Sequence, residues 1–490
     1  MLKIIDNALQ NKNRLAIISN DKNFYYKDLI SKSENIATYL LNGSLDLNEQ
    51  RIAFLVHPSF DYVSIQWGIW RAGGIAVPLC VKHPLNSIQY VIDNAEVSSL
   101  IYSSEFEIII SKIEKKEKLV KINLNQIPFK KSSLPEIDIN RRAMILYTSG
   151  TTGNPKGVVT THLNIEAQIK TLVNAWCWKK KDHIVNVLPL HHVHGIINVV
   201  SCSLWSGACC EFIEKFEPHE LFNIFLKKQV NVFMAVPTIY YKLIQHWNSL
   251  KEKEKEKIGC ALKDFRLMVS GSAALPISVM SQWEKISSHK LLERYGMTEI
   301  GMAISNPYKG TRKPGHIGNS LPGVNVKLLN DYLKEDSSGE IHIKGINVFK
   351  EYWNNPKTTK DSFTSDGWFK TGDIAVYDNN SYRILGRNSV DIIKSGGYKI
   401  SALEIEEILR TNSKIKDCAV VGIPDEEWGE LIVASLVVND RSSFQVEELK
   451  KWLKDKLPVY QLPRKYIFQK DLPRNVMGKV TKNELKKMFN

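Results

Sequence analysis

The sequence lacks every cysteine pattern that would mark a disulfide framework. Its seven cysteines are irregularly spaced over 490 residues, and no two of them form a C-x-x-C pair. An odd number of scattered cysteines is typical of free thiols in a reducing compartment. The pattern therefore argues against a secreted, disulfide-bonded protein.

Long apolar runs are also missing. No uninterrupted apolar segment reaches about 18 residues, the length that suggests a membrane-spanning helix. The nearest candidate, residues 196–210, is interrupted by polar residues and is predicted to be a buried helix. The first residues match neither a signal peptide nor an arginine-rich transit peptide. We expect a cytoplasmic protein without a membrane span.

Acidic residues are too few to balance the basic ones. The 66 Lys and Arg residues against 52 Asp and Glu residues give a formal net charge of +14. A lysine-rich proteome is the favoured explanation, and attraction of anionic ligands such as nucleotides is the alternative. The basic residues are scattered and form no recognised nucleic-acid-binding motif, so we expect no nucleic-acid partner.

The most informative stretch that is present, residues 144–157, reads MILYTSGTTGNPKG. A buried strand that ends in such a loop presents backbone N–H groups, hydroxyls and the Lys156 ammonium to one point, which suits a polyanion. The usual P-loop has Ser or Thr after its lysine, at the start of a helix. Here Gly157 and a β-prone segment follow Lys156. We therefore predict a phosphate-binding loop within a hairpin.

The remaining pattern predicts an α/β protein. Short apolar runs alternate with helical patterns through residues 15–124, which indicates a mostly parallel sheet covered on both faces. A helix with one apolar face is expected at about residues 164–176. From residue 318 the pattern changes to β-hairpins. We expect doubly wound, mostly parallel sheets, a β-hairpin or barrel subdomain, and a small, mobile α+β C-terminal domain.

A joint rich in glycine and polar residues, residues 386–390, separates the expected domains. We place the N-terminal domain at residues 1–387 and the C-terminal domain at residues 388–490. The second is predicted to be a βαβ-like module, with a capping box at residues 401–404 that begins a helix. A lysine-bearing loop at residues 472–480 precedes a final basic helix.

Three histidines follow a predicted strand, at His191, His192 and His194. Their spacing is not that of the helical zinc motifs, and no cysteine or acidic ligand pattern lies beside them. A wall of a substrate pocket is therefore favoured over a metal site.

Three further segments carry side chains suited to a nucleotide. Residues 265–276 begin as a predicted strand and end in small residues, which let a flat ligand lie against the backbone. Residues 293–299 combine an aromatic ring, a hydroxyl and a carboxylate, which could stack a base, bind a phosphate and hold Mg²⁺. Asp373 follows a tight turn, where it could bind a ribose diol or merely cap the turn.

The order of these motifs resembles that of the adenylate-forming enzymes, which include acyl-CoA synthetases, luciferases and carrier-protein adenylation domains. The resemblance runs from about residue 25 to Lys479 and rests on five separate motifs in the expected order. It implies an acid–thiol ligase, an AMP-forming acyl-CoA synthetase, that uses ATP, Mg²⁺ and CoA. Such an enzyme forms an acyl adenylate and releases pyrophosphate and AMP.

The resemblance also implies which residues bind ATP. The β- and γ-phosphates would contact Thr148, Ser149, Gly150, Thr151, Thr152, Gly153 and Lys156. The adenine would lie against Gly271, Ser272, Ala273 and Tyr295. The ribose would bind Asp373 and Arg387.

Catalytic roles follow from the same resemblance. Thr298 would touch the α-phosphate, and Glu299 would hold Mg²⁺. Lys479 would bridge the substrate carboxylate and the α-phosphate, and His192 would stand at the acyl pocket.

The family's C-terminal domain turns between the two half-reactions. After that turn, CoA would be faced by Ser395, Gly396, Gly397 and Lys399. The family hinge usually carries Asp or Lys where this chain has Ser389, so we assign the hinge to about Asn388 and Ser389.

Within the family, residues 188–195, 295–306 and 386–404 look closest to the malonyl-CoA synthetases. A dicarboxylate needs a cation for its distal carboxylate, because burial of an unpaired charge is costly. Arg294 is the favoured cation because it adjoins Tyr295. The other candidates for the acid pocket are Lys242, Arg266, Val193 and Met302. For each cationic candidate, a role in a structural ion pair is an alternative to binding the substrate.

Three other functions stay open. They are a CoA synthetase for a fatty or aryl acid, an acyl-AMP ligase that loads a carrier protein, and a nucleotide-binding scaffold without activity. The scaffold is disfavoured because Lys156, Glu299, Asp373 and Lys479 are all present. The sequence is also compatible with a homodimer.

Overall fold

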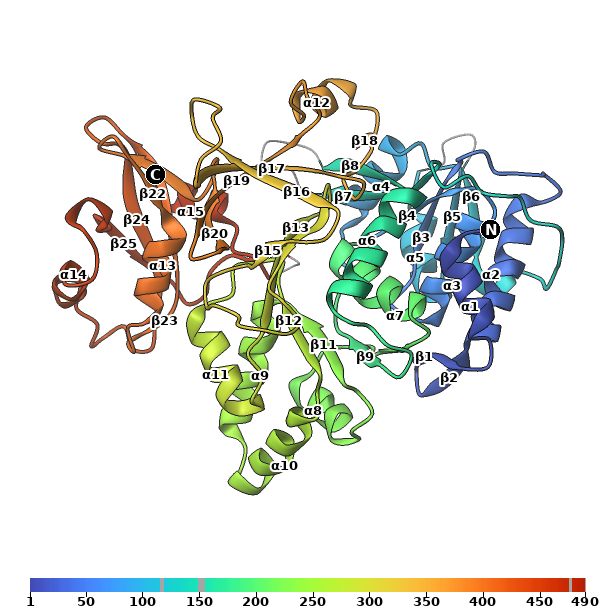
Figure 1. Ribbon diagram of the computed structural model, residues 1–490, viewed down its shortest axis with the longest axis horizontal. Coiled ribbons are helices and arrows are strands. Elements are labelled where there is room, and N and C mark those ends of the chain that lie inside the picture. The colour runs from blue at the N-terminus through green and yellow to red at the C-terminus, as the bar shows by residue number, and fades with distance from the viewer. Residues whose placement is uncertain (115–118, 149–154, 476–477, 490) are drawn as a thin grey trace.

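The computed structural model describes residues 1–114, 119–148, 155–475 and 478–489 (Figure 1). One sheet has the strand order β18-β8-β7-β4-β3-β5-β6. Its strands are β3 (Arg51–Leu55), β4 (Ile75–Pro78), β5 (Ser99–Tyr102), β6 (Val120–Asn123), β7 (Arg142–Thr148), β8 (Lys156–Thr161) and β18 (Glu351–Tyr352). Strands β7, β4, β3, β5 and β6 run parallel. At the edge, β8 pairs antiparallel with β7, and β18 pairs antiparallel with β8.

The segment predicted to bind phosphate forms a hairpin, as expected. Strands β7 and β8 pair antiparallel, and Thr148 lies opposite Lys156 in the pair nearest the connecting residues. The intervening residues Ser149, Gly150, Thr151, Thr152 and Gly153 lie outside the described residues.

A second large sheet has the strand order β15-β14-β13-β12-β11-β9-β10-β1-β2. Its strands are β1 (Leu15–Ser19), β2 (Lys22–Tyr25), β9 (His183–Asn186), β10 (Cys209–Phe212), β11 (Val232–Ala235), β12 (Leu267–Ser270), β13 (Leu292–Met297), β14 (Gly301–Ser305) and β15 (Asn319–Ser320). The strands from β13 to β1 are parallel. The loops after β9, β11, β12 and β13 therefore converge at one edge, where open α/β sheets bind their ligands.

Helices cover both large sheets. Those of the first part of the chain are α1 (Lys3–Gln10), α2 (Tyr26–Leu41), α3 (Phe60–Arg71), α4 (Leu85–Asn94), α5 (Glu107–Ser111), α6 (His162–Ala175) and α7 (Cys202–Trp205). Helices α8 (Pro218–Leu226), α9 (Pro237–Ser249), α10 (Glu252–Lys263) and α11 (Ile277–Ser287) pack lower in the view of Figure 1. The helix expected at 164–176 is α6, so that prediction is confirmed.

The prediction of one buried helix over residues 196–210 is wrong in part. A π-helix spans His194–Ser201 and continues into α7, after which the chain turns at Gly207 and enters β10. The glycine has φ +73°, and a Cβ there would lie 2.8 Å from the Asn11 side chain. Because the whole segment is apolar and buried, its hydrophobicity alone does not separate helix from strand.

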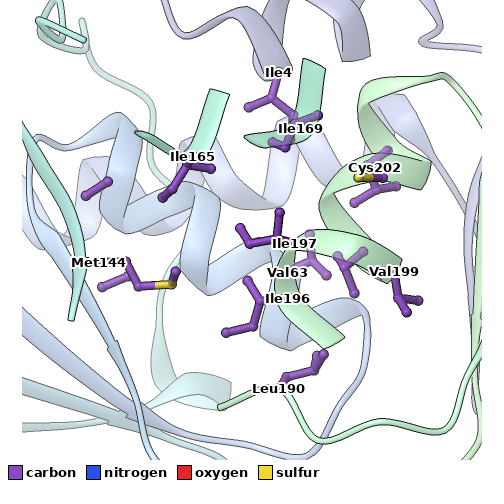
Figure 2. Packing of buried hydrophobic residues seen from close by; sticks show 14 of the residues in the cluster. Ile4, Val63, Met144, Ile165, Ile169, Leu190, Ile196, Ile197, Val199 and Cys202 are labelled. Carbon is purple, nitrogen blue, oxygen red and sulfur yellow. The ribbon is translucent and has the colours of Figure 1, made fainter. Parts of the chain in front are cut away.

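The core between the two large sheets holds the π-helix in place. Figure 2 shows side chains of α3, α6, β7 and the π-helix meeting there, among them Val63, Met144, Ile165, Ile169, Ile196, Ile197 and Val199. All of these residues are buried. This packing fixes His194 at the start of the π-helix.

The predicted β-hairpin subdomain is present. Its sheet has the order β16-β17-β19-β20 and is antiparallel throughout. The strands are β16 (Val324–Leu329), β17 (Ser338–Gly345), β19 (Phe369–Asp378) and β20 (Ser381–Arg387), with the short helix α12 (Pro356–Asp361) nearby. It connects the large sheets to the C-terminal domain (Figure 1).

The C-terminal domain has its own core and lies at one end of the molecule (Figure 1). It contains β21 (Ile392–Ser395), β22 (Tyr398–Ser401), α13 (Ala402–Arg410), β23 (Ile415–Asp425), β24 (Gly429–Val438), α14 (Val446–Lys454), β25 (Lys465–Phe468) and α15 (Lys482–Met488). A βαβ unit occurs only as β24–α14–β25, because the other strand pairs of the sheet, as far as the structure describes it, are antiparallel. The expected βαβ-like module is thus corrected to a mixed sheet.

The expected capping box is half formed. Ser401 Oγ accepts the Glu404 N–H at 3.2 Å. The Glu404 carboxylate instead pairs with Arg383 of β20 at 2.7 Å. The α/β class with a separate C-terminal domain is confirmed. All seven cysteines are free thiols, and none of the described helices is long and apolar enough to cross a bilayer.

Candidate active site

The ribose-binding residues predicted from the motifs meet at the junction of two sheets. Asp373 and Arg387 are directly paired on β19 and β20. Arg387 Nε donates to Asp373 Oδ1 at 3.1 Å, and the Tyr295 hydroxyl from β13 donates to Asp373 Oδ2 at 2.6 Å. Arg387 also donates to the Thr371 carbonyl. The carboxylate is therefore held by two donors from different sheets.

Glu299 lies in the turn between β13 and β14, beside Thr298, and is only 6% exposed. The Tyr352 hydroxyl donates to its Oε1 at 2.9 Å. Burial raises the pKa of Glu299, and the Tyr352 hydrogen bond opposes that rise. No salt bridge to Glu299 exists within the described part of the chain. A buried carboxylate without a paired cation has the chemistry of a ligand for a hard divalent ion such as Mg²⁺.

Lys156 lies close to this carboxylate. Its Nζ is 5.3 Å from the centre of the Tyr352 ring. Tyr352 therefore contacts both the lysine of the phosphate hairpin and the carboxylate of the β13–β14 turn. No motif marked Tyr352, and its role depends on β18 pairing with β8. Sequence patterning had no signal for this contact.

Lys479 reaches the same edge from the C-terminal domain. A Cβ at the neighbouring Gly478 would lie 2.9 Å from Thr238 Oγ1, so this loop packs against the segment that follows β11. Partial removal from water lowers the pKa of Lys479, as do Arg387 and Arg294, whereas Asp373 raises it. The loop thus brings the lysine of one domain within electrostatic reach of Asp373 and Arg387 of the other.

Arg294 is buried behind residues 271–276, the loop predicted to hold the adenine, with 3% of the residue exposed. Its Nη2 donates to Ser272 Oγ at 3.3 Å, and that hydroxyl lies 3.2 Å from His194 Nδ1. A Cβ at Gly271 would be 2.5 Å from Arg294 Cζ, so a glycine is needed for the guanidinium to lie on this backbone. Ser272 itself adopts φ +70°. The adjoining Ala273 is exposed at the rim.

The Arg294 guanidinium forms no salt bridge within the described residues. Its Nε is buried without a hydrogen bond there. Burial lowers the pKa of Arg294 to about 9, although the adjoining Glu293 carboxyl raises it, and the guanidinium stays charged at pH 7. An unpaired buried cation is costly unless an anion joins it. The arrangement therefore suits a substrate carboxylate.

The three histidines after β9 form an uncharged wall beside this cation. Burial, together with the charge of Lys479, lowers the pKa of His192 to about 4. Burial also lowers the pKa of His191 to about 2 and moves that of His194 well below its usual range. Neutral imidazoles leave Arg294 as the cation that a second carboxylate would meet.

The other predicted acid-pocket residues occupy different environments. Arg266 donates to Asp182 at 2.7 Å and to the Trp176 carbonyl at 2.9 Å, so its guanidinium serves a structural ion pair. Lys242 is exposed on α9. Val193 packs against the main core, and Met302 is buried in β14 beneath Gly296. Arg294 alone among the cationic candidates is buried and unpaired within the described residues.

The loop predicted to face CoA contacts the β-hairpin subdomain in this structure. Ser395 is buried, and Gly396 and Gly397 form a turn with φ +56° and +81°. Lys399 pairs with Asp331 of the β-hairpin subdomain. Lys479 and Lys399 thus contact different parts of the N-terminal domain.

Comparison with known proteins establishes the class. The family model for AMP-binding enzymes matches residues 5–353, and the model for their C-terminal domain matches residues 404–479. The chain belongs to the AMP-binding enzyme family, which confirms the resemblance seen in its motifs.

Individual relatives show which members of this family the chain resembles. The human mitochondrial malonate–CoA ligase ACSF3 is 40% identical, over 99% of this chain and 92% of its own length. The malonate–CoA ligase of Arabidopsis thaliana is 38% identical, over 97% of this chain and 86% of its own. ATP-bound MatB from Rhodopseudomonas palustris has a TM-score of 0.92 at 30% identity, and its apo structure has 0.80, each covering 100% of this chain and 99% of MatB.

Proposed function

We propose that this chain is an AMP-forming acyl-CoA synthetase that ligates malonate to CoA. The observation that carries the choice of acid is the buried, unpaired Arg294 behind the loop that follows β12. Malonate needs one carboxylate to react and a second to be neutralised, and Arg294 supplies the second charge. The names of the human and plant relatives agree with this substrate.

The first half-reaction joins malonate to AMP. A carboxylate oxygen attacks the α-phosphorus of ATP, and the bond to the leaving pyrophosphate breaks. Thr148, Lys156 and residues 149–153 would hold the departing phosphates, with the ribose on Asp373. Because two anions must approach, positive charge at the reacting centre is required.

Lys479 would supply that charge between the carboxylate and the α-phosphate, next to Thr298. The close approach of the neighbouring Gly478 to Thr238 supports this role, and Asp373 and Arg387 both affect the pKa of Lys479. Mg²⁺, held at Glu299, would offset the remaining phosphate charge. His192 would line the acyl pocket as a neutral wall, and Tyr295 would flank the adenine.

In the second half-reaction the CoA thiol attacks the acyl carbon, and AMP leaves. We propose that the domain boundary lies at residues 387 and 388 and that the C-terminal domain turns there. Asn388 and Ser389 lie in an exposed turn, and the Asn388 N–H donates to the Gly372 carbonyl at 2.9 Å. The turn would break the Lys399–Asp331 pair and bring residues 395–399 to CoA.

A panel of acids tests the proposal. Pyrophosphate release and thioester formation are measured with malonate, propionate, benzoate and a long-chain fatty acid, and the product is identified by mass. We expect malonate to have the highest kcat/KM, with malonyl-CoA as the product. Turnover of the fatty or aryl acid without malonate would mean a different CoA synthetase. Adenylate that accumulates despite CoA would mean an acyl-AMP ligase.

Three finer properties belong to the same proposal. A requirement for Mg²⁺ is tested by chelation and replacement. A cytoplasmic location is tested by cell fractionation, which matters because the human relative is mitochondrial by name. A homodimer would be seen as twice the chain mass in light scattering.

A further inference from the structure

Helix α13 presents two carboxylates to the N-terminal domain. Glu404 and Glu407 are three residues apart and therefore share a face of the helix. Glu404 pairs with Arg383 Nη1 at 2.7 Å. Glu407 Oε1 accepts a hydrogen bond from the Ile277 backbone N–H at 2.9 Å, across the domain boundary. In the view of Figure 1, α11 lies below α13.

The Ile277 contact lies at the N-terminus of α11. This helix spans eleven residues, its N-cap is Pro276, and no side chain of its own caps the first turn. The first turn also carries no acidic residue. The first N–H groups of a helix need acceptors, and the positive end of the helix dipole favours a carboxylate. Glu407 supplies both from the other domain.

The loop before α11 is the one that would hold the adenine. Its last part is anchored within the N-terminal domain, because the Leu275 N–H donates to Glu293 Oε1 at 3.1 Å. Glu293 is 5% exposed and immediately precedes Arg294. Residues 275 and 277 are therefore held by two glutamates, one from each domain.

The two interdomain contacts differ in their distance from the proposed hinge. Arg383 lies on β20, four residues before Arg387, so its pair with Glu404 can follow a rotation near residue 388. Ile277 begins α11, which packs with the second large sheet, whereas Arg383 belongs to the β-hairpin subdomain. A rotation at residue 388 must therefore separate Glu407 from α11.

We propose that Glu407 is a positioning residue for adenylate formation. It caps α11 only while the C-terminal domain brings Lys479 to the site, and it thereby couples that arrangement to the placement of residues 271–276. Loss of the cap would leave the adenine loop and the Ser272–Arg294 contact less well ordered during the first half-reaction. The inference rests on the proposed function and deepens it.

The test separates the two half-reactions in Glu407→Ala. Acid-dependent exchange of labelled pyrophosphate into ATP reports adenylate formation, and thioester formation from supplied malonyl adenylate and CoA reports the second step. An N-cap is worth about 0.5–2 kcal/mol, so we expect exchange to slow about 2- to 30-fold. The second step should stay within about twofold, since the cap is absent from that arrangement.

Two further variants complete the test. Glu407→Gln keeps an acceptor oxygen but loses the charge, so its exchange rate should lie between those of the alanine variant and the unmodified chain. Glu448→Ala is the matched control, because Glu448 pairs with Lys414 at 2.9 Å inside the C-terminal domain. It should leave both steps unchanged.

Equal loss of both steps in the alanine and glutamine variants would overturn the inference, as would an exchange rate equal to that of the Glu448 control. The proposed function is judged separately, on the unmodified chain. If malonate does not support exchange there, that proposal fails. The ratio of the two steps is then measured with the acid that does support exchange and with its adenylate.

Discussion

Replacement of Arg294 by Met should convert the acid pocket from one for a dicarboxylate to one for a monocarboxylate. Methionine has a similar length but no charge. With it, the distal carboxylate of malonate would be buried without a partner. Breaking a buried ion pair from one side costs about 3–5 kcal/mol, which corresponds to a loss of about 100- to 5000-fold. We expect that loss in kcat/KM for malonate.

Propionate provides the internal comparison, because it has a methyl group where malonate has its second carboxylate. Its kcat/KM should stay within about threefold or rise in Arg294→Met, since an apolar tail no longer lies beside a dehydrated guanidinium. Steady-state pyrophosphate release with both acids at saturating ATP measures the change. The ratio of the malonate kcat/KM to the propionate kcat/KM should therefore fall at least about 30-fold.

Folding should survive this change. Arg294 has no salt-bridge partner among the described residues, so its removal leaves no carboxylate unpaired. Replacement of a buried ion by an apolar side chain is often neutral or stabilising. The thermal midpoint should be unchanged or higher. Lys242→Met, at an exposed position of α9, should leave both acids unaffected.

Equal losses for malonate and propionate in Arg294→Met would refute the reasoning. Such a result would mean that Arg294 supports ATP binding or the loop rather than the distal carboxylate. A raised KM for ATP with both acids would point the same way.

Further changes at the site have distinct expected outcomes. Lys479→Ala should abolish adenylate formation while thioester formation from supplied adenylate persists, and equal loss of both would contradict its role. Because the pKa of Lys479 is lowered, its charge is lost as pH rises through that lowered value, so adenylation should fall at a pH below that of an ordinary lysine. A pH profile measures this fall, and Lys479→Arg should remove it. Glu299→Gln keeps an acceptor for Tyr352 but loses the charge, so the Mg²⁺ needed for half-maximal rate should rise and kcat should fall about 100-fold or more. Gly271→Ala would place a methyl group against the Arg294 guanidinium, so malonate should lose more kcat/KM than propionate does; no difference between the acids would contradict the contact.

Local chemistry made much of the site predictable. The hairpin at residues 144–157 was predictable because Gly157 and β-branched residues stand where a P-loop has its helix. Strand β7 pairs with β8 as expected. The strand ends near His191, Gly271 and Thr298 were predictable because each apolar run stops at small or polar residues. Parallel strands bring such ends to one edge, so the motifs converge.

The partners of these residues were not predictable in the same way. Tyr352 contacts Glu299 from 53 positions away, and Glu407 contacts Ile277 from 130 positions away. No periodic pattern connects residues so distant in the chain. The segment after His194 was misjudged for a related reason, since uniform burial removes the alternation that distinguishes a helix from a strand.

The sequence by itself determined the family, the order of the motifs and the residue types that handle ATP, because these depend on local backbone form and side-chain chemistry. It named Arg294, Arg266 and Lys242 as cations for the acid without separating them by environment. Only the tertiary structure decided among them: Asp182 neutralises Arg266, solvent surrounds Lys242, and Arg294 is buried without a salt bridge among the described residues. The energy of a charge depends on what surrounds it, and those surroundings come from distant parts of the chain.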